Sequence, residues 1–157
     1  MRNSVFRLIS SLIICQLAGF VGSIFTTPAI PDWYASLEKP ALNPPNWIFS
    51  PVWIFLYLLM GVTLYILWQN LPKIEAKIAL VFFAVQLVLN ILWSVIFFGL
   101  KSPMAAFFEI IVLWVFILLT MIKSSKVSKA SVYLLLPYIL WVNFAAILNF
   151  FLWQMNM

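Results

Sequence analysis

Five long apolar segments leave this chain of 157 residues almost no sequence for anything else. Each segment is close to the roughly 20 residues that cross a hydrocarbon core as an α-helix. Only 8% of the residues are charged, whereas soluble proteins carry about 25%. A closed barrel would need alternating strands, and that alternation is weak here. The sequence therefore predicts an all-α integral membrane bundle, one domain over residues 1–157, with five transmembrane helices at about 5–26, 45–69, 76–100, 103–122 and 131–153.

The first apolar segment has two interpretations, because Arg2 and Arg7 near its start are also typical of a secretory signal peptide. The apolar core of a signal peptide usually has about 7 to 15 residues, and this run is longer. We therefore expect a retained transmembrane helix. Cys15 lies inside it and is the only cysteine of the chain, which excludes an intramolecular disulfide.

The basic residues predict how the chain lies in a cell membrane. Seven of them fall at the N-terminus and in the even-numbered connections: Arg2, Arg7, Lys73, Lys77, Lys123, Lys126 and Lys129. Only Lys39 and Lys101 fall on the opposite side. By the positive-inside rule, we expect a cytoplasmic N-terminus, with the C-terminus and the first connection outside. This asymmetry accounts for the net charge of +5, so no nucleic-acid partner is expected.

The stretch from Pro28 to Tyr57 is unusual for a connection between two apolar segments. It holds six of the nine prolines and three of the eight tryptophans. The connection at residues 26–43 is longer than most loops, yet its aromatic and aliphatic side chains argue against disorder. We expect a folded lid over the outer ends of the helices. Asn43 is a candidate N-cap for the second helix, and Pro51 is expected to kink it.

Polar side chains recur within the apolar segments. Gln86, Asn90 and Trp93 share one helical stripe, which faces either a cavity or a neighbouring helix to which the amides hydrogen-bond. Glu109 is the only carboxylate inside a predicted span. Two interpretations of Glu109 stay open, a functional group and a packing contact near the end of the helix.

Topology and depth together predict where the aromatic and polar residues meet. The outer half of the bundle is expected to contain Trp53, Asn90, Trp93, Glu109 and Asn149, with Trp141 near the middle. Beneath a lid, these side chains would line a pocket for a large, flat, mostly apolar ligand. The alternative is an aromatic core that packs against itself. Trp47 and Trp68 are interpreted as interfacial anchors.

Several sequence blocks resemble those of one known family. They are VGSIF at 21–25, WYASLEKPALNPPNWIFSPVW at 33–53, QLVLNILW at 86–93, IFFGLKS at 96–102 and LLPYILWVNFAAILNFFLW at 135–153. The chain resembles the tryptophan-rich sensory protein family, the bacterial relatives of the mitochondrial translocator protein once called the peripheral-type benzodiazepine receptor. The resemblance covers nearly the whole chain.

This resemblance implies a five-helix bundle, commonly a homodimer, that binds porphyrins and isoquinoline or benzodiazepine-type compounds under the first loop. The ligand-binding residues expected here are Trp33, Tyr34, Lys39, Pro44, Trp47, Trp53, Tyr57, Asn90, Trp93, Trp141 and Ala145. Some bacterial members promote light-dependent breakdown of protoporphyrin, and Trp53 and Trp141 would take part in it. The sterol-binding segment of animal members has Tyr and Arg where this chain has Phe150 and Gln154, which makes sterol binding doubtful.

The chemistry available to the chain is narrow. There is no nucleophile–base pair, metal cluster or phosphate-binding glycine loop, and no His to ligate haem. A metal-free porphyrin, protoporphyrin IX, is therefore the expected ligand or substrate, with no covalently bound cofactor. A photochemical reaction would need only light and oxygen in addition.

Three functions follow from these expectations. We rank tetrapyrrole binding for sensing first, photo-oxidative degradation as its consequence, and transport, with Glu109 as the ion-coupling candidate, third. The expected dimer rests on the resemblance and on the small residues Gly99, Ala105 and Ala106. The physiological ligand, the dimer face and the access route stay open.

Overall fold

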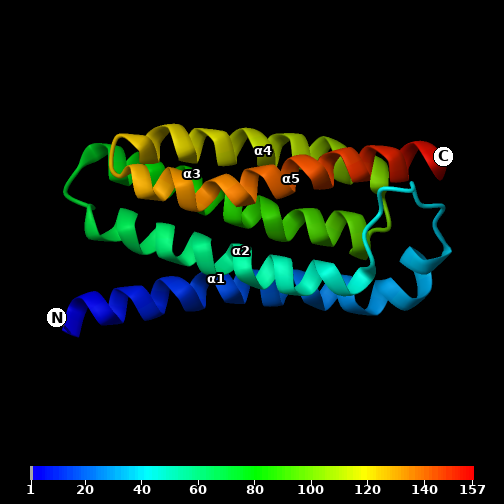
Figure 1. The fold of residues 1–157 in the computed structure, drawn as a ribbon, viewed down its shortest axis with the longest axis horizontal. Coiled ribbons are helices and arrows are strands. Elements are labelled where there is room, and N and C mark those ends of the chain that lie inside the picture. The colour runs from blue at the N-terminus through cyan, green and yellow to red at the C-terminus, as the bar shows by residue number, and fades with distance from the viewer. Residues whose placement is uncertain (1) are drawn as a thin grey trace.

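The computed structural model describes residues 2–157, and its long helices run up and down in alternation (Figure 1). They are α1 (Arg2–Ala29), α2 (Asn46–Gln69), α3 (Ile74–Ser94), α4 (Pro103–Ser125) and α5 (Lys129–Met155). Two π-helical turns, η1 (Ile30–Tyr34) and η2 (Val95–Gly99), extend α1 and α3. All five helices are long and apolar enough to cross a membrane, so the predicted all-helical fold with five such helices is confirmed.

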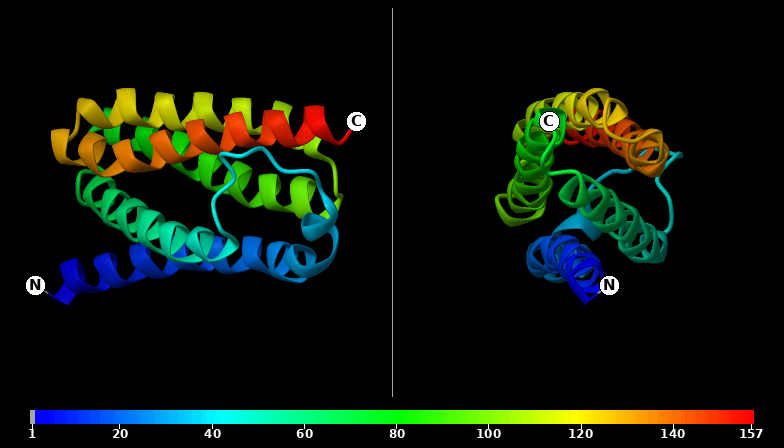
Figure 2. Two further views of the ribbon diagram at one scale, coloured as in Figure 1. Left: turned by 45° about the vertical axis from the view of Figure 1, so that its right-hand side comes forward. Right: turned by 90° about the vertical axis from the view of Figure 1, so that its left-hand side faces the viewer.

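The helices form one bundle, with the two chain termini at opposite ends (Figure 1). α4 packs against both α3 and α5, while α1 packs mainly against α2 (Figure 2). Contacts of α2 with α5 and of α1 with α3 join these groups. The end of the bundle at which α1, α3 and α5 finish is called its C-terminal end.

The first connection is shorter than predicted, because the first helix continues past residue 26. Pro28 lies inside α1, and Pro31 lies in the π-helical turn η1. Proline has no N–H to donate, so regular α-helical bonding is interrupted at both positions. The π-helical turn η1 follows at this point, and such turns occur in proteins mostly as single turns joined to α-helices. The segment that leaves helical geometry is therefore residues 37–45.

The proposed N-cap of the second helix was wrong. Pro45 occupies the cap position of α2, and no side chain caps the helix start. The Asn43 side chain instead accepts a hydrogen bond from the Tyr34 hydroxyl at 2.7 Å and donates to the Pro44 carbonyl at 3.2 Å. Asn43 thus ties the connection to the end of the first helix.

Two groups of buried side chains divide the bundle along its length. The larger group extends through most of the bundle and includes Met60, Leu67, Phe83 and Ile117. A smaller group lies at the C-terminal end: Tyr34, Phe97, Ala106, Leu148 and Leu152. Near the larger group α1 and α2 approach closely, since a Cβ added to Gly61 would lie 2.9 Å from the Leu12 Cα.

Candidate functional site

A cavity of about 390 Å³ lies where the two buried groups meet. Its volume is within the roughly 300–1,000 Å³ of small-molecule sites. Its walls come from α1, η1, α2, α3, η2 and α5, and within residues 2–157 α4 contributes none. Seven of the eleven residues predicted to bind ligand line it: Tyr34, Trp53, Tyr57, Asn90, Trp93, Trp141 and Ala145.

The other four predicted residues lie elsewhere at the C-terminal end. Trp33 lines a second, separate cavity, and the indole of Trp47 is 73% exposed. Lys39 lies over the Tyr34 ring, with its Nζ 5.0 Å from the ring centroid. Pro44 contributes only its carbonyl, to Asn43. The structure therefore does not bring these four side chains to the main cavity.

Aromatic rings form much of the wall. The rings of Trp53 and Tyr57 on α2 lie 5.6 Å apart, and those of Trp93 and Phe97 stack at 5.0 Å. Trp141 on α5 meets Phe49 on α2 at 6.1 Å. Aromatic rings from α2, α3, η2 and α5 therefore line the cavity, and a flat ligand gains most from offset or edge contacts with such rings.

One indole is held in place by a hydrogen bond rather than by packing alone. The Trp93 Nε1 donates to the Asn149 Oδ1 at 3.1 Å, and the Asn149 Nδ2 donates to the Pro103 carbonyl at 2.7 Å. Asn149 also lines the cavity. This bond fixes the Trp93 ring against α5, and Trp93 lines the cavity.

A chain of buried hydrogen bonds joins three helices beside the cavity. The Tyr57 hydroxyl donates to the Asn90 Oδ1, and the Asn90 Nδ2 donates to the Tyr138 hydroxyl at 2.9 Å. The Tyr138 hydroxyl donates in turn to the Gln86 Oε1 at 2.8 Å. Of the two interpretations of this polar stripe, helix-to-helix bonding is confirmed for both amides, and Asn90 lines the cavity as well.

Glu109 does not line the cavity, contrary to its predicted place among the converging residues. It lies on α4 and is 9% exposed. In the described part of the chain, neither of its carboxyl oxygens has a hydrogen-bond partner. Glu109 is thus a buried carboxyl group without a partner, separate from the aromatic walls.

Sequence reasoning missed the wall formed by α1. This wall is made by Gln16, Gly19, Phe20, Gly22, Ser23, Thr26 and Thr27. The available signal was a set of small and polar residues in an otherwise apolar helix. A Cβ added to Gly19 would lie 2.5 Å from the Tyr57 ring, so glycine lets α1 approach this ring.

The cavity lining has no charged side chain in the described structure. No cluster of His, Cys, Asp or Glu that could hold a metal ion is found within residues 2–157. The arrangement therefore offers stacking surfaces, hydroxyl groups and a few amides, which suit a mostly uncharged aromatic ligand.

The hydrogen-bond chain yields a stability prediction. Replacing Asn90→Leu leaves the buried Tyr57 hydroxyl without its acceptor, so we expect a loss of about 1–3 kcal/mol in the free energy of unfolding. Adding Tyr57→Phe removes the unpaired hydroxyl and should recover part of that loss. Unfolding in detergent micelles measures both. Equal stability of wild type and Asn90→Leu would contradict the role assigned to this chain.

Comparison with known proteins agrees with this architecture. The profile of the TspO/MBR family matches residues 11–154. The Tryptophan-rich protein TspO of Chlorobaculum tepidum is 43% identical, with 99% of both chains covered. The Tryptophan-rich protein TspO of Archaeoglobus fulgidus is also 43% identical, covering 98% of this chain and 99% of its own. The Translocator protein of Bos taurus is 37% identical over 90% of this chain and 85% of its own. The chain therefore belongs to the TspO/MBR family and is a multi-pass membrane protein.

Proposed function

We propose that the protein binds a tetrapyrrole, protoporphyrin IX, in the main cavity. The observation that carries this proposal is a cavity of about 390 Å³ lined by three indoles, Trp53, Trp93 and Trp141, and by no charged group in the described structure. A flat macrocycle can stack on such rings. The carboxylates of the porphyrin would stay at the polar rim near Thr27, because burial in an uncharged wall costs several kcal/mol.

Smaller aromatic compounds of the isoquinoline or benzodiazepine type use the same walls. They need stacking area and few polar contacts, and the cavity supplies both. Asn90 and Asn149 are already engaged with protein groups, so they offer a ligand only their remaining hydrogen-bonding capacity. Shape and aromatic area therefore decide selectivity more than hydrogen bonds do.

Light-dependent oxidation of the bound porphyrin is the proposed consequence of binding. The porphyrin absorbs light, and oxygen supplies the oxidant. Trp53 and Trp141 line the cavity from α2 and α5, so each indole lies where it can contact the macrocycle. An indole in contact with an excited porphyrin can exchange an electron with it, so these two residues are the proposed catalytic groups.

The segment at residues 37–45 is the proposed lid. Asn156, just after α5, accepts a hydrogen bond from the Glu38 backbone N–H at 2.9 Å and donates to the Glu38 carbonyl at 3.0 Å. The Tyr34–Asn43 bond holds a second point of the segment, and Tyr34 lines the cavity. With the N-terminus cytoplasmic, as the basic residues predict, this lid lies outside the cell membrane.

Two further parts of the proposal concern transport and assembly. Transport is the second candidate function, and it is favoured by the unpartnered carboxyl group of Glu109. Porphyrin flux into sealed vesicles that is lost in Glu109→Gln would rank transport first.

A homodimer remains proposed from the family. Ala106 is fully buried within the subunit, so only Gly99 and Ala105 of the predicted small residues are exposed for such a contact.

The photochemical proposal predicts an effect of two substitutions. In the dark, protoporphyrin IX should quench tryptophan fluorescence saturably, and under light its absorption should fade faster with the protein than without it. Trp53→Phe and Trp141→Phe should each slow the fading and retain at least part of the binding, because phenyl rings still stack. Trp153→Phe is the matched control, since Trp153 lies on α5 outside the cavity. If protoporphyrin IX binds but its absorption fades no faster than without the protein, the protein is a binder or sensor and the proposed enzyme-like role is wrong.

The lid proposal predicts faster ligand exchange when the link from Asn156 to Glu38 is removed. Asn156→Ala deletes both bonds to Glu38, so we expect protoporphyrin IX to dissociate on the order of ten times faster. Stopped-flow release into excess scavenger protein measures this rate. Asn143→Ala, an exposed position on α5, is the control. An unchanged rate in folded Asn156→Ala would show that the segment does not gate the cavity.

A further inference from the structure

Few charged side chains lie at the C-terminal end of the bundle, and two of them, Asp32 and Lys101, line one cavity. Lys39 and Glu38 belong to the proposed lid, where the Lys39 Nζ donates to the carbonyls of Ala35 and Leu37. The other two, Asp32 and Lys101, line the same second cavity of about 270 Å³. A carboxylate and an ammonium group thus line the same cavity at this end of the bundle.

The second cavity is apolar toward the membrane interior and charged toward the end of the bundle. On the side formed by α1 and η1, Ile24, Pro28 and Asp32 follow one another at intervals of four residues, about one helical turn. Ile24 is 55% exposed, so this side faces the surroundings of the bundle. A cavity with this gradient fits an amphiphile whose polar head lies at the membrane surface.

Lys101 occupies a backbone conformation that is costly for its residue type. Its φ of 54° is in the left-handed region, which costs roughly 1–2 kcal/mol for a residue other than glycine. The turn is held by hydrogen bonds from the Leu100 N–H to the Val95 carbonyl at 2.8 Å and from the Ser102 N–H to the Ile96 carbonyl at 3.2 Å. Strained residues of this kind concentrate at functional sites. The geometry of this turn does not favour lysine, so we attribute the lysine at this position to a role of its ammonium group.

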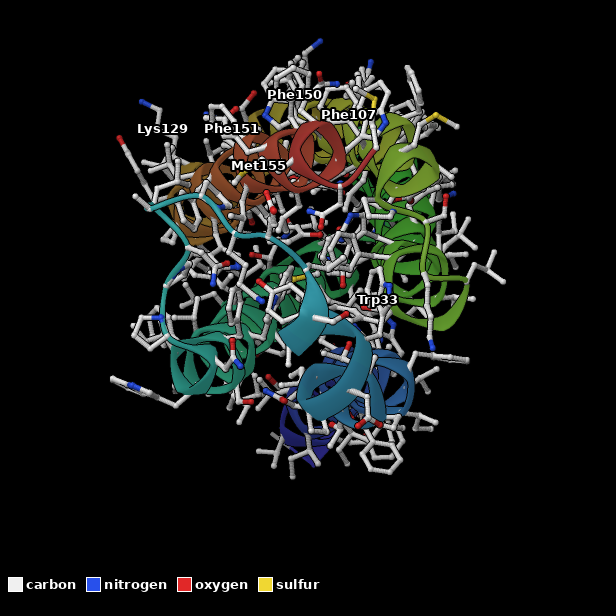
Figure 3. All side chains as sticks on the ribbon, turned by 90° about the vertical axis from the view of Figure 1, so that its right-hand side faces the viewer. Trp33, Phe107, Lys129, Phe150, Phe151 and Met155 are labelled. Carbon is white, nitrogen blue, oxygen red and sulfur yellow. The ribbon has the colours of Figure 1, made fainter. Side chains whose placement is uncertain are left out.

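Trp33 completes the polar half of this cavity. Its ring meets Phe97 and Phe98 edge-on, with centroids 5.5 Å and 6.4 Å away. In the view onto the C-terminal end of the bundle, Trp33 lies between the end of the first helix and α3 (Figure 3). Phe98 lines both cavities and so forms a wall between them. Tryptophan is favoured at the headgroup level of a bilayer, where its ring can also face a cation.

We propose that the second cavity binds one phospholipid with a phosphoethanolamine headgroup. Lys101 contacts the phosphate, Asp32 accepts hydrogen bonds from the primary ammonium group, and an acyl chain follows Ile24 and Phe25. A choline headgroup has no N–H to donate to Asp32, and an anionic glycerol headgroup leaves the carboxylate without a positive partner. The site involves neither Trp53 nor Trp141, so it is independent of the proposed porphyrin binding.

Native mass spectrometry of the delipidated protein tests this proposal. The protein in detergent is titrated with phosphatidylethanolamine, phosphatidylcholine and phosphatidylglycerol that carry the same acyl chains. We expect one phosphatidylethanolamine to be retained per chain, about tenfold more tightly than the other two lipids. Asp32→Asn and Lys101→Gln should each weaken this retention by about tenfold.

Matched variants separate this site from general lipid attachment. Glu38→Gln removes a carboxylate at the same end of the bundle but outside the second cavity, and Lys73→Gln removes a cation at the opposite end. Both should retain phosphatidylethanolamine as the wild type does, and circular dichroism checks that all variants fold. Equal retention of the three lipids, preference for phosphatidylglycerol, or unchanged retention in both Asp32→Asn and Lys101→Gln would overturn the proposal.

Discussion

The hydrogen-bond chain from Tyr57 through Asn90 and Tyr138 to Gln86 is the interaction on which the rest of this bundle depends. In a hydrocarbon environment, packing of apolar side chains does not distinguish one helix neighbour from another, because lipid tails are equally apolar. A buried amide that loses its partner cannot turn to water. The chain therefore fixes the mutual position of α2, α3 and α5, which are the three helices that carry the indoles of the main cavity.

Helix spacing explains why the cavity lies toward one end of the bundle. Gly61 lets α1 lie directly on α2 near Leu12, and the buried side chains there fill the interior. Toward the C-terminal end, the large rings of Trp53, Trp93 and Trp141 are held at the walls by neighbouring rings and by Asn149. Rings fixed at the walls cannot collapse inward, so space for a ligand remains between them.

The fold and about half of the site follow from the sequence for a simple physical reason. Long apolar runs predict membrane-length helices, and the spacing of Trp53, Tyr57, Asn90 and Trp93 predicts which faces turn inward. The first connection was harder to predict, because a π-helical turn that contains Pro31 and extends a helix leaves no distinctive pattern in composition. Trp33 shows how this longer helix changes the site. The family resemblance implied a ligand-binding role for Trp33, but in the structure Trp33 lines the second cavity.

The α1 wall and the position of Glu109 outside the cavity were also hard to predict from the sequence. Gln16, Ser23 and Thr27 are weakly polar, so their contribution to a cavity depends on how close α1 lies to α2, which the sequence does not state. Glu109 was predicted from its depth to lie among the cavity residues, yet depth alone does not tell whether a residue faces a cavity or a helix contact. For Glu109 the missing quantity was the rotation of α4 about its own axis.

Replacing Ala145, a small side chain in the cavity wall, with a larger one tests most directly whether protoporphyrin IX binds in this cavity. Ala145 lines the cavity on α5, and Ile147 on the same helix is 47% exposed. Protoporphyrin IX is titrated in the dark against wild type, Ala145→Phe and the control Ile147→Phe. We expect Ala145→Phe to bind at least about tenfold more weakly, as for a blocked site, while Ile147→Phe binds as wild type does. Equal affinity of all three proteins, with Ala145→Phe folded, would contradict binding in this cavity.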